Sequence, residues 1–158
     1  MKKRILSLAL SAAMALTMLP TGAFAASDKG KPPVYNKATG CYEISTPDQL
    51  LYLSGSWRDG APRDGHYVLT ADIDMTGVKG FKPIASKKDQ GFTGTFDGQF
   101  HAIKGLRVEY EKKYAGLFGY VGNQDDQAYI KDVALLDCYV TGQQNVGALA
   151  GVNYGTIT

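Results

Sequence analysis

The sequence has only two cysteines, Cys41 and Cys138. Cys41 lies well beyond the apolar N-terminal run, which excludes it as a lipid anchor at a cleavage site. An exported protein can oxidise two cysteines to a disulfide, but the sequence does not place their Cα atoms within bonding range. One disulfide and two separate thiols therefore both stay open.

The chain also has almost no net charge beyond residue 25. Residues 1–25 contain three of the 17 basic side chains and none of the 15 acidic ones, which leaves 14 positive against 15 negative. Nucleic-acid binding needs a clustered positive field, and the lysine pairs at 87–88 and 112–113 form no basic stripe. The composition therefore argues against nucleic acid as a partner.

Several catalytic motifs are absent from the chain. The only histidines, His66 and His101, lie in unrelated turn contexts, and no His-Glu-x-x-His or Gly-x-Ser-x-Gly motif occurs. A zinc peptidase and a serine-nucleophile elbow are excluded within this sequence. We expect no catalytic residue, no bound metal and no cofactor.

Long apolar runs are absent beyond Ala25. Met1 to Arg4 is basic, residues 5–19 are uncharged and mostly apolar, and residues 23–25 are Ala-Phe-Ala. This pattern predicts a signal peptide at 1–25, cleaved after Ala25 or alternatively Ala26. The apolar run is too short for a stable span, which takes roughly 20 residues. We expect a secreted or cell-surface protein with no stable membrane insertion after cleavage.

The mature chain starts with a segment that has no apolar period. Residues 26–40 mix small, charged and proline residues, which predicts a flexible linker. A short strand is expected at "CYEIS", followed by a helix with Thr46 as N-cap, Pro47 in its first turn and Gln49 completing a capping box. Gly55 lies where a C-cap is expected. We assign residues 41–66 to an N-terminal cap, in which Leu50, Leu51 and Leu53 cover the open end of the repeats.

The rest of the chain is typical of β-structure. "HYVLTADIDM" alternates apolar and polar residues, which predicts a strand with Tyr67, Leu69, Ala71, Ile73 and Met75 on one face. A tight turn is expected at Asp97 and Gly98, and no further helix is needed.

Internal similarity is the most informative feature. Ile103, Ile130 and Ile157 begin related segments in a 27-residue register, and this spacing aligns Leu106 with Val133 and Val108 with Leu135. A second similarity, between 116–119 and 148–151, has a longer, 32-residue offset. Compensating insertions of five residues in "GNQDDQAY" and "DCYVTGQQN" reconcile the two offsets. We infer a solenoid with one rung per repeat, its strands stacked about 4.8 Å apart.

The glycine motifs fit the interior corner of such a coil. Glycine permits close approach of neighbouring strands and a positive φ, while large apolar residues fill the core. A membrane-helix motif, a nuclear-pore repeat and a phosphate loop are less consistent with the flanking sequence. The predicted structural repeat positions are Ile103, Gly116, Leu117, Phe118, Gly119, Ile130, Gly147, Leu149, Gly151 and Ile157.

Several motifs in order resemble the GLUG-repeat proteins, named for their Gly-Leu-x-Gly pattern. They are "LTADIDM", "GFKPI", "GTFDGQFHAIKGLRV", "AGLFGYVG", "IKDVAL" and "VGALAGVNYGTI", within residues 42–158. The resemblance implies a right-handed parallel β-helix in secreted or surface-attached bacterial proteins, including adhesin-like proteins and non-catalytic regions of some immunoglobulin-A proteases. Phe100 and Ala148 depart from the family's glycines; the first is expected to widen its corner and the second to cost little.

Two groups of side chains could bind a ligand. Asp72 and Asp74 lie on one face of the expected strand, and with Asp97 they could bind calcium or assist hydrolysis. The alternative is a solvated edge strand with Asp97 opening a turn. The ten tyrosines and Trp57 could stack on sugars, although such residues more often pack on or beneath a β-surface.

The sequence as a whole predicts an all-β chain, a β-helix of about three rungs over residues 67–158, incomplete at its C-terminus. We expect a non-catalytic scaffold for adhesion or ligand binding that forms the N-terminal part of a longer protein. The alternative is an accessory region of a secreted peptidase or glycan-active enzyme. Candidate partners are a host or cell-wall glycan or a protein, and a calcium-dependent binder is a third hypothesis.

Overall fold

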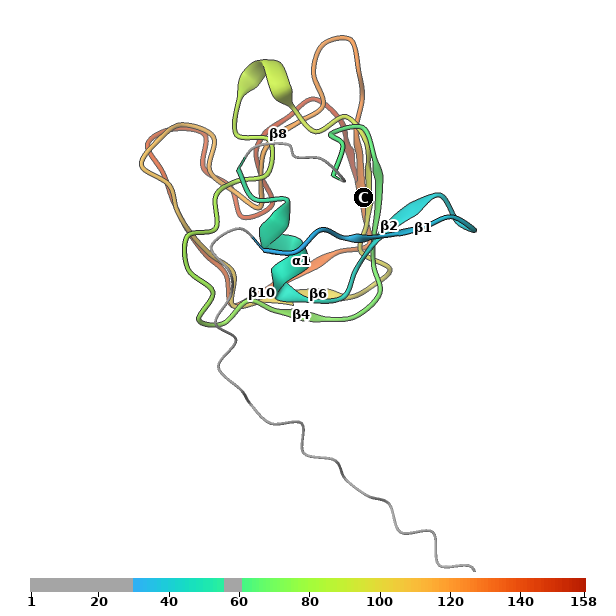
Figure 1. Ribbon diagram of the computed structural model, residues 1–158. Coiled ribbons are helices and arrows are strands. Elements are labelled where there is room, and N and C mark those ends of the chain that lie inside the picture. The colour runs from blue at the N-terminus through green and yellow to red at the C-terminus, as the bar shows by residue number, and fades with distance from the viewer. Residues whose placement is uncertain (1–29, 56–60) are drawn as a thin grey trace, which may run out of the picture.

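The computed structural model describes residues 30–55 and 61–158, and these residues form an all-β fold. The expected signal peptide and Trp57 lie outside the described residues. One short α-helix and one 3-10 turn accompany the strands (Figure 1). The elements are β1 (Val34–Asn36), β2 (Cys41–Ile44), α1 (Pro47–Tyr52), β3 (His66–Leu69), β4 (Ile73–Asp74), η1 (Lys88–Gln90), β5 (Thr95–Asp97), β6 (Ala102–Lys104), β7 (Arg107–Glu109), β8 (Phe118–Val121), β9 (Tyr129–Lys131), β10 (Ala134–Leu136), β11 (Tyr139–Thr141), β12 (Ala150–Asn153) and β13 (Thr156–Ile157).

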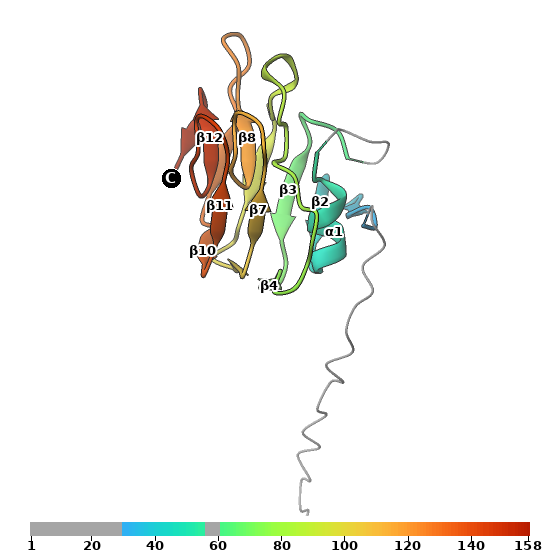
Figure 2. The same cartoon turned by 90° about the vertical axis from the view of Figure 1, so that its left-hand side faces the viewer.

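The strands are arranged in parallel ladders that run along one axis of the molecule. The largest sheet has the order β1-β2-β3-β5-β9-β13, and all its pairs except β1 with β2 are parallel. Smaller parallel ladders follow the orders β10-β6-β4, β11-β7 and β12-β8. Seen from the side, successive passes of the chain lie next to one another, with α1 at one end and the C-terminus at the other (Figure 2).

The ordered structure begins before Cys41, so the predicted linker is wrong over residues 34–40. β1 pairs antiparallel with β2, and the ring centroids of Tyr35 and Tyr42 lie 4.9 Å apart. Gly40, with φ of +71°, donates its N–H to the carbonyl of Asn36 and closes the hairpin. Cross-strand aromatic and hydrogen-bonded pairs stabilise this segment, which composition alone marks as unstructured.

The predicted N-terminus of the helix is confirmed. The Thr46 side chain accepts from the Gln49 N–H, and the Gln49 side chain accepts from the Thr46 N–H, which completes the capping box. The C-cap is Leu53, not Gly55, and Gly55 follows two residues later with φ of +87°. All three helix-associated leucines are buried in the core, at the end of the stacked strands where α1 lies (Figure 2).

A row of aromatic rings runs through the core across successive passes. Tyr67 contacts Tyr42 at 5.2 Å and Phe92 at 6.0 Å between ring centroids, and Phe118 contacts Phe92 at 5.2 Å and Phe96 at 5.4 Å. Ladder register brings Tyr42 and Tyr67 together, because in-register strands stack side chains of equal orientation on the same face. Phe118 is not the ladder partner of Phe92 or Phe96, so these rings meet inside the core from different ladders.

The expected alternation in "HYVLTADIDM" is confirmed for four of its five apolar positions, but Ala71 is only half-buried, because the segment is two strands and Ala71 lies in the bend between them. β3 ends at Leu69 and β4 begins at Ile73. The two strands enter different sheets, which allows the chain to turn a corner while Tyr67, Leu69, Ile73 and Met75 all stay buried.

The 27-residue register between Ile103 and Ile130 is wrong. Ile103 pairs with Ile73 on one side and Leu135 on the other, so its partner in the next pass is not Ile130. Val108 likewise pairs with Val140, not Leu135. Ile130 belongs to the largest sheet, where it pairs with Phe96 and with Ile157. The spacing from Ile130 to Ile157 is real, whereas Ile103 shares no ladder with either.

The 32-residue offset of the glycine motifs is the spacing that separates paired residues when β6, β7 and β8 pair with the next pass. Phe118 pairs with Ala150, and the pairs in the two neighbouring ladders have the same offset. The predicted insertion in "DCYVTGQQN" is therefore wrong, because the chain keeps this register through β11 into β12. The insertion in "GNQDDQAY" is confirmed: seven residues separate Val121 from Tyr129, and two separate their ladder partners Asn153 and Thr156.

Glycines in the repeated motif permit close approach, but their predicted positive φ is wrong. None of Gly116, Gly119, Gly147 and Gly151 has a positive φ. A Cβ at Gly119 would lie 2.7 Å from the Cα of Ser86 in the preceding pass. Leu117 and Phe118 between the glycines are fully buried, so their role as core filling is confirmed.

Phe100 occupies a tight turn with its side chain exposed. Its φ is +62°, that of Gln99 is +47°, and His101 donates its N–H to the carbonyl of Gly98. Residues 98–101 form an ordinary four-residue turn. The widening that was expected from Phe100 in place of glycine is therefore wrong. Phe100 instead adopts the left-handed backbone that glycine favours.

Candidate functional site

Most of the predicted repeat residues belong to the core and its glycine contacts, but Ile157 in β13 is 39% exposed, so its predicted place in the core is wrong. Ile103, Leu117, Phe118 and Ile130 are buried, and Leu149 is half-buried in the last pass. Gly147 and Gly151 lie in or beside β12, where a Cβ would meet backbone atoms. These positions serve packing between stacked strands and bring no polar side chains together.

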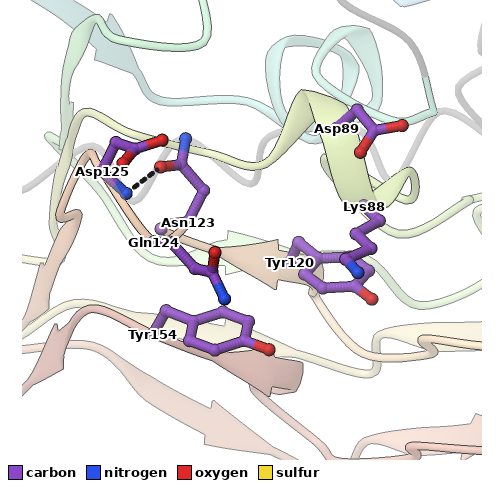
Figure 3. A pocket seen from close by; sticks show the side chains of 8 residues that line it. Lys88, Asp89, Tyr120, Asn123, Gln124, Asp125 and Tyr154 are labelled. Atoms are coloured by element: carbon purple, nitrogen blue, oxygen red, sulfur yellow. Dashed lines mark hydrogen bonds between the residues drawn. The ribbon is translucent and has the colours of Figure 1, made fainter.

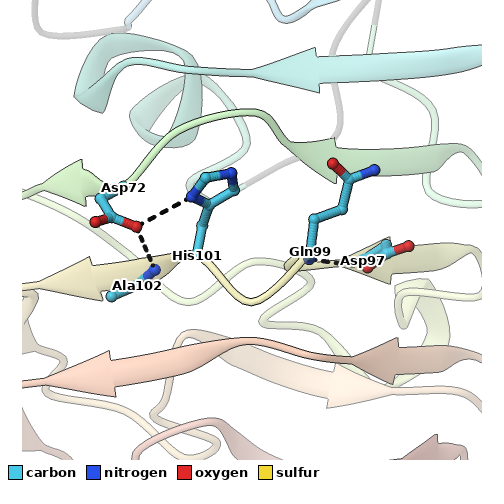
Figure 4. Close-up of polar contacts among 5 residues, drawn as sticks. All are labelled: Asp72, Asp97, Gln99, His101 and Ala102. Atoms are coloured by element: carbon cyan, nitrogen blue, oxygen red, sulfur yellow. Dashed lines mark hydrogen bonds and ion pairs between the residues drawn. The ribbon is translucent and has the colours of Figure 1, made fainter.

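Asp72 connects two neighbouring passes of the chain. One of its carboxylate oxygens accepts from the N–H of Ala102 at 2.9 Å and lies 3.1 Å from Nδ1 of His101 (Figure 4). The hydrogen bond from Ala102, with a smaller contribution from His101, lowers the pKa of Asp72. This carboxylate holds the β5–β6 corner against the bend before β4.

Asp74 and Asp97 have separate local partners. Asp74 accepts from the N–H of Thr76 at 2.9 Å, and hydrogen bonding by Thr76 lowers the pKa of this carboxyl. Asp97 accepts from the N–H of Gln99 at 2.9 Å and lies 2.9 Å from the ammonium of Lys131. Burial opposes ionisation of Asp97, but Lys131 and Gln99 outweigh it and the pKa is lowered.

The three carboxylates therefore serve turns and inter-strand contacts, as in the alternative that the sequence left open. Across residues 30–55 and 61–158, no three His, Cys, Asp or Glu side chains are grouped so as to hold a metal ion.

Cys41 and Cys138 are separate free thiols, and burial raises the pKa of Cys138.

A pocket of about 310 Å³ lies where two loops from neighbouring passes meet. One loop contains η1 and connects Ile84 to Phe92; the other connects β8 to β9. Seven residues separate Ile84 from Phe92, whereas two separate their bridge partners Phe118 and Val121. Each loop is thus five residues longer than the matching corner of the next pass, and both protrude at the same side of the molecule (Figure 1).

Two tyrosines form part of the pocket wall. Tyr120 lies in β8 and is 4% exposed, with its ring centroid 4.5 Å from that of Tyr114. Tyr154 is 49% exposed, and its N–H donates to the carbonyl of Val121. Burial, then a side-chain hydrogen bond with Tyr114 and the nearby Tyr154 and Asp89, raises the pKa of Tyr120. Its hydroxyl stays protonated at neutral pH.

Polar side chains complete the pocket, and one of them shapes the loop. The Asn123 side chain accepts from the N–H groups of Asp125 and Asp126 at 2.8 and 2.7 Å, and it donates to the Asp126 carboxylate at 3.2 Å. Figure 3 shows Gln124 pointing toward Tyr154, and Lys88 lines the same pocket as Tyr120. The remaining charged groups are Asp89 and Asp125.

The other side of the same loop borders a second depression of about 350 Å³. Its lining residues are strongly polar and include no aromatic side chain: Arg63, Asp64, Thr93, Asp125, Asp126 and Gln127. The β8–β9 loop therefore has an aromatic side and a purely polar side.

Sequence reasoning missed the tyrosine pocket. The inserted "GNQDDQAY" was the signal that could have found it, because an insertion at one corner of a stacked coil indicates a surface loop. Nothing in the sequence places Lys88 beside that loop or Tyr120 beside Tyr154, since both arrangements depend on the ladder register.

The chain is thus an all-β protein of stacked parallel strands, with loops that protrude at one corner. This chain is 34% identical over 134 residues to Halomucin from Haloquadratum walsbyi, an alignment that covers 75% of the chain and 1% of Halomucin. It is 33% identical over 101 residues to a protein named as a Gly-rich membrane protein from Evansella cellulosilytica, covering 58% of the chain and 11% of that protein. No family model and no solved structure matches. The chain thus spans only a small part of these relatives.

Among the helices of the described residues, none is long and apolar enough to span a bilayer. The single α-helix in that part of the chain, α1, has six residues.

Proposed function

We propose that residues 67–158 form a right-handed parallel β-helix of the GLUG-repeat type, capped by α1 at its N-terminal end. The continuous parallel ladder from β2 through β3, β5 and β9 to β13 supports this arrangement. Right-handed crossovers between parallel strands are strongly preferred, which favours the proposed hand.

We propose that this coil is a secreted or cell-surface scaffold without catalytic activity, which displays binding loops. The observation that carries the proposal is the stacking of successive passes, because it produces a rigid core from which loops extend at fixed positions. Similarity to Halomucin and to a protein named as a membrane protein supports a surface location. The expected signal peptide supports export.

Cysteine cross-linking tests the proposed coil. In a Cys41→Ser, Cys138→Ser background, Ala102→Cys with Ala134→Cys is expected to form a disulfide under mild oxidation, because these residues are paired in β6 and β10. Adjacent strands are about 4.8 Å apart, within the range that a disulfide spans. The control pair Ala102→Cys with Tyr129→Cys represents the 27-residue register and is expected to stay reduced. Intact mass under non-reducing conditions separates the two, and preferential cross-linking of the control pair would contradict the proposed coil.

Cell fractionation tests the proposed location. We expect the full-length protein in the medium, or on intact cells in a form accessible to added protease, and we expect deletion of residues 5–19 to retain it in the cytoplasm. A full-length protein that is cytoplasmic and protected from protease would overturn the surface assignment.

A further inference from the structure

The pocket between the η1 loop and the β8–β9 loop combines aromatic and hydrogen-bonding groups in one corner. Its two loops come from neighbouring passes, and Tyr154 comes from the pass that follows. Because each pass is joined to the next by parallel pairs, the strand residues from which these loops extend are held at fixed distances. Such preorganisation lowers the entropic cost of binding a small ligand.

Tyr154 provides the exposed aromatic face of this pocket. Its ring is half-exposed, and its backbone is tied to β8 through the hydrogen bond to Val121. Tyr120 lies deeper, packed on Tyr114, and keeps a neutral hydroxyl that can both donate and accept. An amphipathic ligand with an apolar face and a polar rim matches this pair.

The polar groups offer both donors and acceptors around the tyrosines. Lys88 donates, Asp89 and Asp125 accept, and the Gln124 amide does both (Figure 3). Asn123 holds the loop through three hydrogen bonds, so the side chains next to it start from an ordered backbone. Two carboxylates against one ammonium disfavour an anionic ligand.

A neutral sugar ring has the required chemistry. It presents a patch of C–H groups to an aromatic ring and hydroxyls that donate and accept at its edge. The volume of about 310 Å³ is at the lower end of the range of ~300–1,000 Å³ for small-molecule sites. The pocket therefore suits one or two sugar units.

We propose that this pocket is a carbohydrate site that binds neutral hexose units of a glycan, with Tyr154 as the stacking platform and Gln124, Asp89 and Asp125 as hydroxyl partners. The assignment rests on the proposed function of the chain as a surface binding scaffold. It adds a defined site and a ligand class to that function.

The test uses the full mature chain titrated by NMR with glucose, galactose, N-acetylglucosamine, maltose and cellobiose. At least one neutral sugar is expected to bind saturably, and Tyr154→Ala is expected to weaken that binding about tenfold or more, because it removes the aromatic face on which the sugar ring would stack. Gln124→Ala is expected to weaken it several-fold. Tyr129→Ala is the matched control, because Tyr129 is 52% exposed on β9 and does not line the pocket.

Glucuronate tests the predicted preference for neutral ligands. It should bind more weakly than glucose, because its carboxylate would face Asp89 and Asp125. The carbohydrate assignment would be overturned by no saturable binding of any neutral sugar in the set, by equal binding to wild type and Tyr154→Ala, or by tighter binding of glucuronate. Thermal melts of each variant confirm folding. A protein that is exported and cross-links as proposed but binds no sugar loses this site and keeps its scaffold function.

Discussion

Replacing Phe118 by alanine is expected to lower the free energy of unfolding by about 3–5 kcal/mol. Phe118 is 0% exposed, and its ring contacts both Phe92 and Phe96. Truncation removes buried apolar area, leaves a cavity and deletes two aromatic contacts, each worth ~0.5–1.5 kcal/mol beyond burial. The loss should appear as a lower denaturant midpoint with an unchanged slope.

The matched control is Phe100→Ala, which removes the same atoms from a side chain that is 86% exposed. Surface substitutions of this kind usually change the free energy of unfolding by no more than ~0.5 kcal/mol. Equal losses in the two variants would mean that the aromatic row is not the centre of the core. The comparison therefore tests the packing of the aromatic core independently of any ligand.

The local features of this chain follow directly from its sequence. The capping box needs only Thr46, the N-cap, and Gln49, the third residue of α1. The burial of Leu117 and Phe118 follows from a large apolar pair between glycines that lie close to neighbouring backbone. Each depends on a few adjacent residues, so no knowledge of the distant chain is required.

The ladder register does not follow from the sequence, because the passes differ in length. No two steps along the largest sheet are equal, as its successive pairs show: Ile44 with Leu69, Val68 with Asp97, Phe96 with Ile130 and Ile130 with Ile157. Loops at the corners lengthen at little cost in closure entropy, so the strand spacing in sequence is free to vary. The even spacing of isoleucine at positions 103, 130 and 157 therefore suggested one repeat, although Ile103 lies in a smaller ladder and the other two lie in the largest sheet.

The pocket depends on this register as well as on loop length. Tyr120 and Tyr154 come from consecutive passes, and the η1 loop reaches them from a third. The insertion in the β8–β9 loop is visible in the sequence as a break in similarity. The pairing of Ile84 with Phe118 places the η1 loop against it, and this pairing is not visible in the sequence. A binding site formed between passes of a coil is therefore visible only after the strands are aligned.

Replacing Gly119 by alanine is the second substitution with a large expected effect, about 3 kcal/mol of lost unfolding free energy. The new Cβ would lie 2.7 Å from the Cα of Ser86 and 2.8 Å from the carbonyl oxygen of Ala85, and neither backbone atom can move aside as a flexible side chain would. The ladder at this point includes hydrogen bonds from Gly119 to Ile84 at 2.6 Å and from Tyr120 to Ala85 at 3.0 Å. Separating the two passes to admit a methyl group would lengthen both.

Gly77→Ala provides the comparison, because a Cβ there meets no atom within 4 Å but the backbone has φ of +80°. Its cost should be limited to the left-handed backbone, about 1–2 kcal/mol. Chemical denaturation of both variants measures the difference. If Gly119→Ala is no less stable than Gly77→Ala, close contact between passes does not explain the glycine of the Gly-Leu-Phe-Gly motif. A larger loss at Gly119, where φ is not positive, would identify interstrand distance as the reason for glycine at this corner.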